Sequence, residues 1–185
     1  EYAQLVGKSV SAVQEEYGNL MKAQSTVLQN ANNAWKTAGL SANQYMETVT
    51  SFSASLIQSV GGDTQKAADM ADMALQDMAD NANKMGSDMD MIMQTYQSIA
   101  RGNYAMLDNL KLGYGGTKTE MQRLVKDAAK LDKSIDQNSL SYANVVKAIH
   151  AVQNEMGITG TTQLEAEKTI TGSLSAMKAA WENTL

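Results

Sequence analysis

The 185-residue sequence contains no proline and no cysteine, and it has a single phenylalanine and a single histidine. Without cysteine, a disulfide framework and a cysteine-ligated zinc site are both excluded. Without proline, no residue is present that must interrupt a helix. Ala, Met, Gln, Lys and Glu are abundant and favour helices, whereas strand-forming residues are scarce. The composition therefore predicts an all-α protein.

The formal net charge is −5, and the isoelectric point is about 4.9. This acidity argues against nucleic-acid binding by the segment as a whole. One local basic run is present, and Asp127 and Asp132 dilute it, so we interpret it as a solvated helix face; its members are Lys118, Arg123, Lys126, Lys130 and Lys133. No apolar run has the length of a membrane span, so none is expected in this segment.

The chain begins at Glu1 rather than at methionine, and no signal peptide is visible at its start. The apolar residues of the predicted first helix already follow helical spacing within its first turn. We therefore predict that residues 1–185 are a single helical region cut from a longer protein.

A long heptad-type helix is predicted over residues 1–38, ending at Gly39. Its apolar seam alternates spacings of four and three. The seam comprises Val6, Val10, Val13, Tyr17, Leu20, Gln24, Val27, Ala31 and Ala34.

Residues 41–102 predict three further helices, which end at Gly61-Gly62, at Gly86 and at Gly102. Ser41 and Gln44 form a capping box for the first of them. The second carries an inward stripe of Ala67, Met70, Ala71, Ala74, Met78, Ala82 and Met85. The third points Met89, Ile92, Met93, Tyr96 and Ile99 inward.

Residues 118–185 predict the last three helices. The final one should start at a capping box formed by Thr162 and Glu165. It is expected to bury Leu164, Ile170, Leu174, Met177 and Trp181. In total the sequence predicts about seven helices joined by glycine-rich turns, in a helical bundle with a long first helix.

A glycine-rich connection occupies residues 103–117, with Gly113, Gly115 and Gly116 close together. Thr117 and Glu120 follow as a capping box for the next helix. A phosphate-binding P-loop aligned on Lys118 would need glycines at positions that hold Leu112 and Thr117. A Gly-x-Gly-x-x-Gly pattern fails at Lys118. We therefore interpret the stretch as a packed connection.

Residues 103–118 read NYAMLDNLKLGYGGTK, and they resemble the most recognisable segment of the tail tape measure proteins of long-tailed bacteriophages and prophages of Gram-positive bacteria. The resemblance extends to residues 51–90, 143–162 and 172–185. It implies the conserved non-ruler region of a non-catalytic tail protein, which acts in tail assembly and tail-length determination and leaves the tube when the genome is ejected. The implied partners are tube and baseplate proteins, assembly chaperones and other copies of itself. The implied location is the virion tail, and the host bacterial cytoplasm during assembly.

Candidate chemical groups in the sequence are few. His150 has only Asn154 and Glu155 nearby in sequence, which is insufficient for a catalytic base. The carboxylates Asp77, Asp80, Asp88 and Asp90 lack the spacing of a calcium loop, so we interpret them as caps and solvated turns. We therefore predict no enzyme activity and no catalytic, cofactor-binding or metal-binding residue.

The methionine-rich helices favour core packing or an adaptable contact surface over soft-metal binding. Met73 and Met91 lie off the expected core stripe, which makes them the best sequence evidence for a protein contact.

Two alternatives remain open from the residues alone. The chain could be a helical protein–protein interaction module unrelated to phage tails. It could instead be a piece of a tail-associated cell-wall hydrolase, which would require a catalytic acid in a cleft.

Overall fold

The computed structural model describes residues 7–182, and within this range it contains seven α-helices, one short 3₁₀ helix and no strand. The all-α prediction is therefore confirmed. The helices are α2 (Val10–Thr37), α3 (Ala42–Ser59), α4 (Thr64–Met85), α5 (Met89–Ala100), η1 (Leu107–Leu110), α6 (Lys118–Leu131), α7 (Tyr142–Glu155) and α8 (Thr161–Glu182). None of them, over the residues described, is long and apolar enough to cross a membrane.

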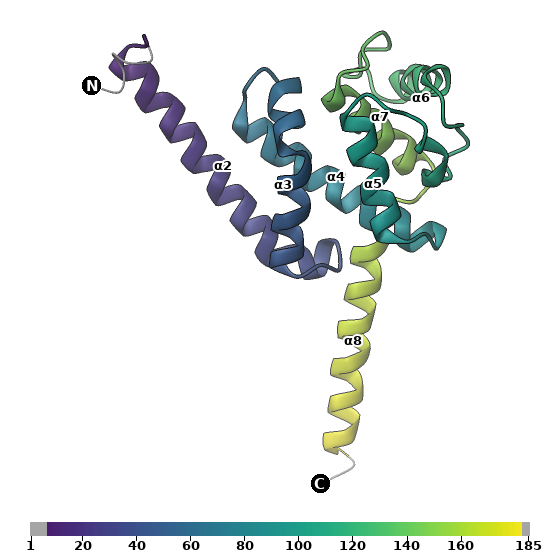
Figure 1. Cartoon of the computed structure of the whole chain (residues 1–185). Helices are drawn as coiled ribbons and strands as arrows, with labels where there is room; N and C mark the ends of the chain where they lie inside the picture. The colour runs from purple at the N-terminus through teal and green to yellow at the C-terminus, as the bar shows by residue number, and fades with distance from the viewer. Residues whose placement is uncertain (1–6, 183–185) are drawn as a thin grey trace.

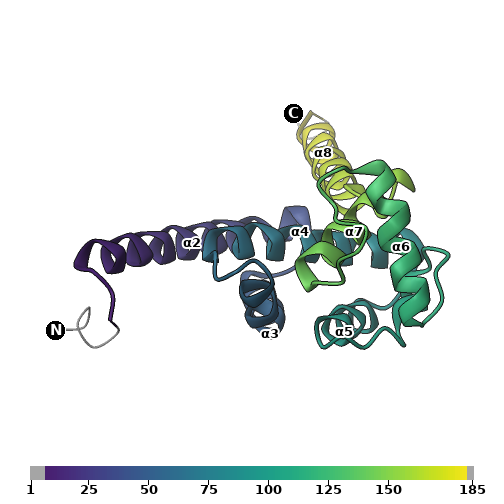
Figure 2. The ribbon, with the colours of Figure 1, turned by 90° about the horizontal axis from the view of Figure 1, so that it is seen from above.

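Helix α4 is the centre of the fold, because it contacts α2, α3, α5, α7 and α8. It crosses the molecule with α2 and α3 on one side and α5, α6 and α7 on the other (Figures 1 and 2). Its first half presents small side chains to its neighbours, and Ala67, Ala71 and Ala74 are all buried there. Small residues at these positions let α2 and α3 pack closely on α4.

Two helices extend away from this body. The N-terminal half of α2 leaves on one side, and α8 extends as a long stalk (Figure 1). The prediction that the last helix buries its apolar stripe is wrong, because Leu164, Ile170, Leu174 and Met177 are exposed. Only the first two turns of α8 contact the body, where Glu167 pairs with Lys36 of α2 at 3.4 Å, and among the described residues nothing covers Ile170, Leu174 and Met177. The side chain of Trp181 lies outside the described residues.

The predicted seam of α2 is buried over only half of its length. Ala31 and Ala34 pack into the core, whereas Val10, Tyr17 and Leu20 are exposed. The helix also begins later than predicted, at Val10, where Ser9 accepts a hydrogen bond from the backbone N–H of Ala12. The earlier part of the predicted helix, residues 1–6, lies outside the described residues.

The glycine-rich connection between α5 and α6 is packed against the body. It contains the unpredicted 3₁₀ turn η1, and Leu107, Leu110 and Leu112 are buried within it. The loop therefore contributes side chains to the same core as the helices.

Candidate functional site

A layer of polar side chains, all buried except the half-buried His150, lies where α4, α5 and α7 meet. Its members are Asp77, Asp80 and Asn81 on α4, Tyr96 on α5, and Tyr142, His150 and Gln153 on α7. The prediction that Asp77 and Asp80 lie on solvated turns is wrong, because their residues are only 1% and 2% exposed. Other helices surround α4, so even its polar face is covered. Buried charges of this kind require partners.

Asp77 is paired with His150. The Nδ1 atom of His150 lies 2.9 and 3.0 Å from the two carboxylate oxygens of Asp77. Burial raises the pKa of Asp77 to about 6, although the hydrogen bond from His150 opposes this rise. The same hydrogen bond raises the pKa of His150, and the charges of Asp77, Asp80 and Asp132 add to the effect.

An aspartate–histidine pair is one half of the arrangement that activates a nucleophile in hydrolases. The other half would be a hydroxyl or thiol that hydrogen-bonds to the second ring nitrogen. The chain has no cysteine, and no serine or threonine among the described residues makes that hydrogen bond. What the geometry provides is a hydrogen-bonded pair of a buried carboxylate and a half-buried imidazole, which joins α4 to α7.

Asp80 joins α4 to the start of α8. Its carboxylate accepts hydrogen bonds from the backbone N–H of Gly160 at 2.6 Å and of Thr162 at 2.8 Å. The positive end of the α8 helix dipole also stabilises a carboxylate at this position. The predicted capping box of Thr162 and Glu165 is wrong, because α8 begins at Thr161 and the Thr162 hydroxyl is buried without a partner among the described residues. The capping group comes from another helix, which sequence spacing could not reveal.

Asn81 connects the glycine-rich connection to this layer. Its side-chain amide donates hydrogen bonds to the carbonyl oxygen of Leu110 and to Oε1 of Gln153, both at 2.9 Å. Among the described residues, four buried atoms of the layer have no hydrogen-bond partner; they are Asn81 Oδ1, Gln153 Nε2, Tyr96 Oη and Tyr142 Oη. Burial raises the pKa of Tyr96. The nearby Gln153 opposes this rise, although it forms no hydrogen bond with the Tyr96 hydroxyl.

Two side chains of α6 form hydrogen bonds with the backbone of the glycine-rich connection. Glu120 accepts a hydrogen bond from the Gly115 N–H at 3.1 Å, and Arg123 donates one to the Gly113 carbonyl oxygen at 2.8 Å. Arg123 also lies 4.3 Å above the Tyr114 ring. The predicted capping box is only half formed, because Thr117 accepts from the Glu120 N–H while the Glu120 carboxylate reaches Gly115 instead of Thr117. The Gly115 N–H, which a bound phosphate would need as a free donor, therefore already donates to a carboxylate.

The basic run of α6 lies on its exposed face. Arg123 pairs with Glu120 at 2.6 Å, and Lys130 pairs with Asp127 at 2.7 Å. The local acidic residues therefore neutralise part of the run. Exposed pairs such as these contribute little to stability.

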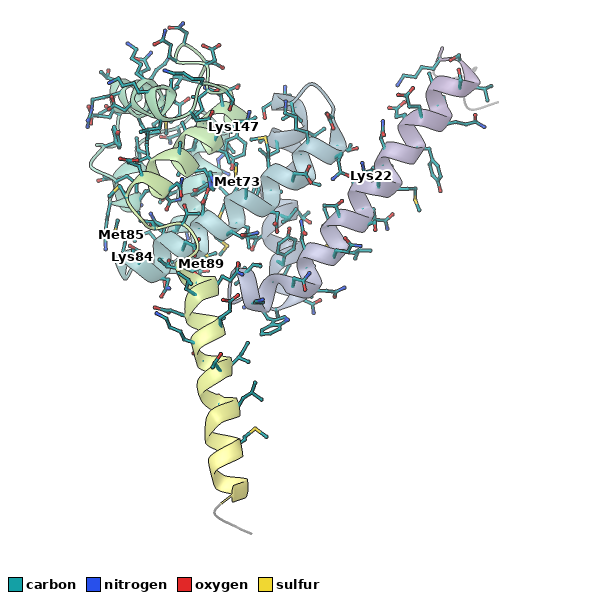
Figure 3. The ribbon with its side chains drawn as sticks, turned by 180° about the vertical axis from the view of Figure 1, so that it is seen from behind. Lys22, Met73, Lys84, Met85, Met89 and Lys147 are labelled. Atoms are coloured by element: carbon teal, nitrogen blue, oxygen red, sulfur yellow. The ribbon has the colours of Figure 1, made fainter. Side chains whose placement is uncertain are left out.

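The methionines line the edge of the core rather than forming a free patch. Met73, Met85, Met89 and Met93 are half-buried and pack against the core, and Met91 is also half-buried. Figure 3 shows Met85 and Met89 close together where α4 gives way to α5, with Met73 farther along α4. Within residues 7–182, no group of three His, Asp or Glu side chains is placed to hold a metal ion.

The exposed apolar side chains of α2 form a candidate contact surface. We define the α2 seam as Val10, Val13, Tyr17 and Leu20. It borders a cavity of about 190 Å³ where α2 separates from α3 and α4, lined among others by Leu20, Val27, Val49, Ile57 and Ala67. Leu20 also borders a second hollow, of about 420 Å³, together with Val13 and Tyr17. Leu20 thus borders both hollows, and it borders a third, of about 640 Å³, together with the carboxylates of Glu15, Glu16 and Asp63.

Comparisons with known proteins identify no relative of this chain. No protein-family model, no curated protein and no solved structure matches it.

Proposed function

We propose that this chain is the conserved non-ruler region of a phage tail tape measure protein, a structural component that acts in tail assembly and tail-length determination without catalysis. The observation that carries the proposal is the segment 103–118, NYAMLDNLKLGYGGTK, which resembles that family. In the fold this segment supplies Leu107, Leu110 and Leu112 to the core. Its role is therefore to hold helices together.

The distribution of side chains supports action through contacts. Both α2 and α8 extend from the body with exposed apolar side chains, such as Tyr17 and Leu174 at 64% and 61% exposure. Exposed apolar stripes of this kind are typical of protein–protein contact sites. The proposed partners are tube and baseplate proteins, assembly chaperones and other copies of the chain, in the virion tail and, during assembly, in the host bacterial cytoplasm.

Deletion analysis in the phage or prophage that carries this gene tests the proposal. Short in-frame deletions within residues 41–185 should abolish tails or leave them misassembled, because they disrupt a folded body. Deletions of equal length in the ruler region of the same protein are the matched control, and these should shorten the tails. Electron micrographs give the readout. Viable phage whose tails shorten in proportion to the residues removed from 41–185 would contradict the assignment of this segment to a non-ruler region.

A helical interaction module outside phage tails is a second candidate, since the same exposed stripes would serve it. The genes beside this one distinguish the two. Tail-tube and baseplate genes on either side would favour the tail function, and their absence would favour the general module.

A further inference from the structure

The base of α8 is held by a short turn that contains two glycines in the left-handed backbone region. Gly157 and Gly160 have φ values of 65° and 84°, and Ile158 between them is only 1% exposed. Asp80 on α4 accepts hydrogen bonds from the backbone N–H groups of Gly160 and Thr162, where the helix starts. The direction of the stalk therefore depends on how this turn lies against α4.

The glycine-rich connection is held by the next residue of α4. The side-chain amide of Asn81 donates one hydrogen bond to the Leu110 carbonyl oxygen and another to Oε1 of Gln153, both at 2.9 Å. All three residues are 0% exposed, so solvent does not reach these groups to replace a bond that is lost. Two adjacent residues of α4 thus hold two segments that lie far apart in the sequence.

Gln153 on α7 links the two anchoring points. Its side chain bonds to Asn81, and its backbone carbonyl oxygen accepts the N–H of Ile158 at 2.9 Å in the turn before α8. Both donors of Asn81 belong to one nitrogen atom, so a movement of Leu110 that turns this amide also disturbs the bond to Gln153. Buried hydrogen bonds that are joined in series reinforce one another, because the surrounding dielectric constant is low. A displacement of the connection therefore reaches the turn that positions α8.

We propose that the glycine-rich connection and the base of α8 are energetically coupled through Asn81 and Gln153, so that displacing the connection loosens the stalk. The packing of the two segments otherwise follows different helices, since α8 packs on α2 and α4 while η1 packs on α5. A partner that displaces the connection would release the stalk, and one that orders the connection would hold the stalk in place. The coupling depends on the fold alone, so its failure would leave the tail proposal untouched.

Hydrogen exchange on the 185-residue chain tests the coupling. Gly116→Ala perturbs the connection, because a Cβ there would overlap the backbone carbonyl of Ala105. We expect exchange of the Gly160 and Thr162 N–H groups to accelerate at least about fivefold, which is the lower end of the coupling found between linked sites. The Lys66 N–H, which bonds to the Asp63 carboxylate at the start of α4, is the internal reference and should not change.

Gly115→Ala is the matched control, because its Cβ would lie 3.6 Å from the flexible side chain of Glu120. It should leave exchange at the base of α8 unchanged. Gln153→Met replaces the bonding amide with an unbranched apolar side chain, and in this background Gly116→Ala should lose its effect on α8. Unchanged exchange at the base of α8 in the Gly116→Ala chain would overturn the proposal. The same acceleration with and without the Gln153 side chain would also overturn it.

A reciprocal experiment covers the case in which Gly116→Ala does not fold, because coupling between two sites acts equally in both directions. Gly160→Ala strains the turn before α8, since its φ of 84° is unfavourable for a residue with a Cβ. The Lys111 N–H bonds to the Asp108 carbonyl oxygen at the end of η1, and its exchange should then accelerate at least about fivefold. A folded Gly160→Ala chain with wild-type exchange at Lys111 would contradict the coupling.

Discussion

At the residue scale, Asp77 and His150 make the stability of the fold depend on pH. Both pKa values are raised in the folded protein, that of Asp77 to about 6 by burial and that of His150 by the carboxylate it contacts. At pH 6 the folded chain therefore binds more protons than the unfolded chain; the excess on Asp77 is lost as the pH rises past about 6, and the excess on His150 is lost as the pH rises through its raised pKa, above 6.5. Because of this difference, the free energy of unfolding falls as the pH rises through that window. No other histidine and no cysteine contribute there.

Urea denaturation at pH 6, 7 and 8 measures this slope. The wild-type midpoint should be highest at pH 6 and lowest at pH 8. Asp77→Asn should flatten the dependence, because His150 then lacks the carboxylate that raises its pKa. His150→Gln is the second variant: it removes the hydrogen bond and the charge that oppose the rise in the pKa of Asp77, so the titration of Asp77 should move to higher pH and a slope should remain. A wild-type midpoint that rises with pH, or a slope that Asp77→Asn retains in full, would show that the pair does not govern this window.

The glycines of the connection are not equivalent, which gives a second prediction. A Cβ added to Gly116 would overlap the backbone carbonyl of Ala105, whereas one added to Gly115 would lie 3.6 Å from the flexible Glu120 side chain. Gly116→Ala should therefore destabilise the protein by about 1–3 kcal/mol, as overpacking does. Gly115→Ala, the matched control, should change stability by no more than about 0.5 kcal/mol. Thermal melts of the two variants measure the difference, and equal melting temperatures would refute it.

Residue types alone could not have identified these two features. The sequence shows Gly113, Gly115 and Gly116 as one cluster, but only the fold brings Ala105 against Gly116. Asp77 and His150 are 73 positions apart, and the sequence alone predicts that Asp77 lies in a cap or a solvated turn. Their pairing depends on the packing of α7 against α4, which local patterns do not encode.

At the element scale, the sequence predicts where helices form better than it predicts which groups cap their ends. Ser41 and Gln44 form the predicted capping box in full, because both partners belong to one turn. The start of α8 was wrongly predicted, because its capping carboxylate, Asp80, lies on α4 about eighty positions earlier. Local caps can be predicted from spacing, and caps supplied by a distant helix cannot.

Asp80→Ala should therefore loosen α8 specifically. The change leaves the backbone N–H groups of Gly160 and Thr162 without their acceptor. Removing hydrogen bonds to a charged group costs about 1.5–3 kcal/mol. Hydrogen exchange should accelerate at the start of α8 far more than in α6. Asp69→Ala is the control on the same helix, since Asp69 is exposed and bonds only to Gln65. Equal exchange at the start of α8 in both variants would show that Asp80 does not anchor this helix.

At the scale of the whole molecule, the glycine breaks of the sequence correctly indicate a folded bundle. They do not show which apolar stripes become buried. The stripes of α2 and α8 follow the same helical spacing as that of α4, yet Leu20 and Leu174 are exposed while Met78 is fully buried. Which stripe is covered depends on the directions in which helices leave their turns, and this is a property of the whole fold.

Small-angle scattering tests the resulting shape. A compact chain of this length would have a radius of gyration of ~16 Å. One continuous helix of 185 residues would span ~280 Å at a 1.5 Å rise per residue, which corresponds to a radius of gyration of ~80 Å. The body around α4 should keep the measured radius of gyration much closer to that of the compact chain than to that of the rod. The projecting arm of α2 and the stalk of α8 should raise it above the compact value (Figure 1).

The measurement should be a dilution series extrapolated to zero concentration, so that association between molecules does not contribute to the value. The distance distribution should then show one main peak from the body and an extended tail from the two projecting helices. Removing the chain from Gly172 onward, which takes away the outer part of the α8 stalk, should shorten the tail and leave the main peak in place. A value near that of the rod would contradict the bundle. A value at the compact limit without a tail would mean that α2 and α8 fold back onto the body in solution.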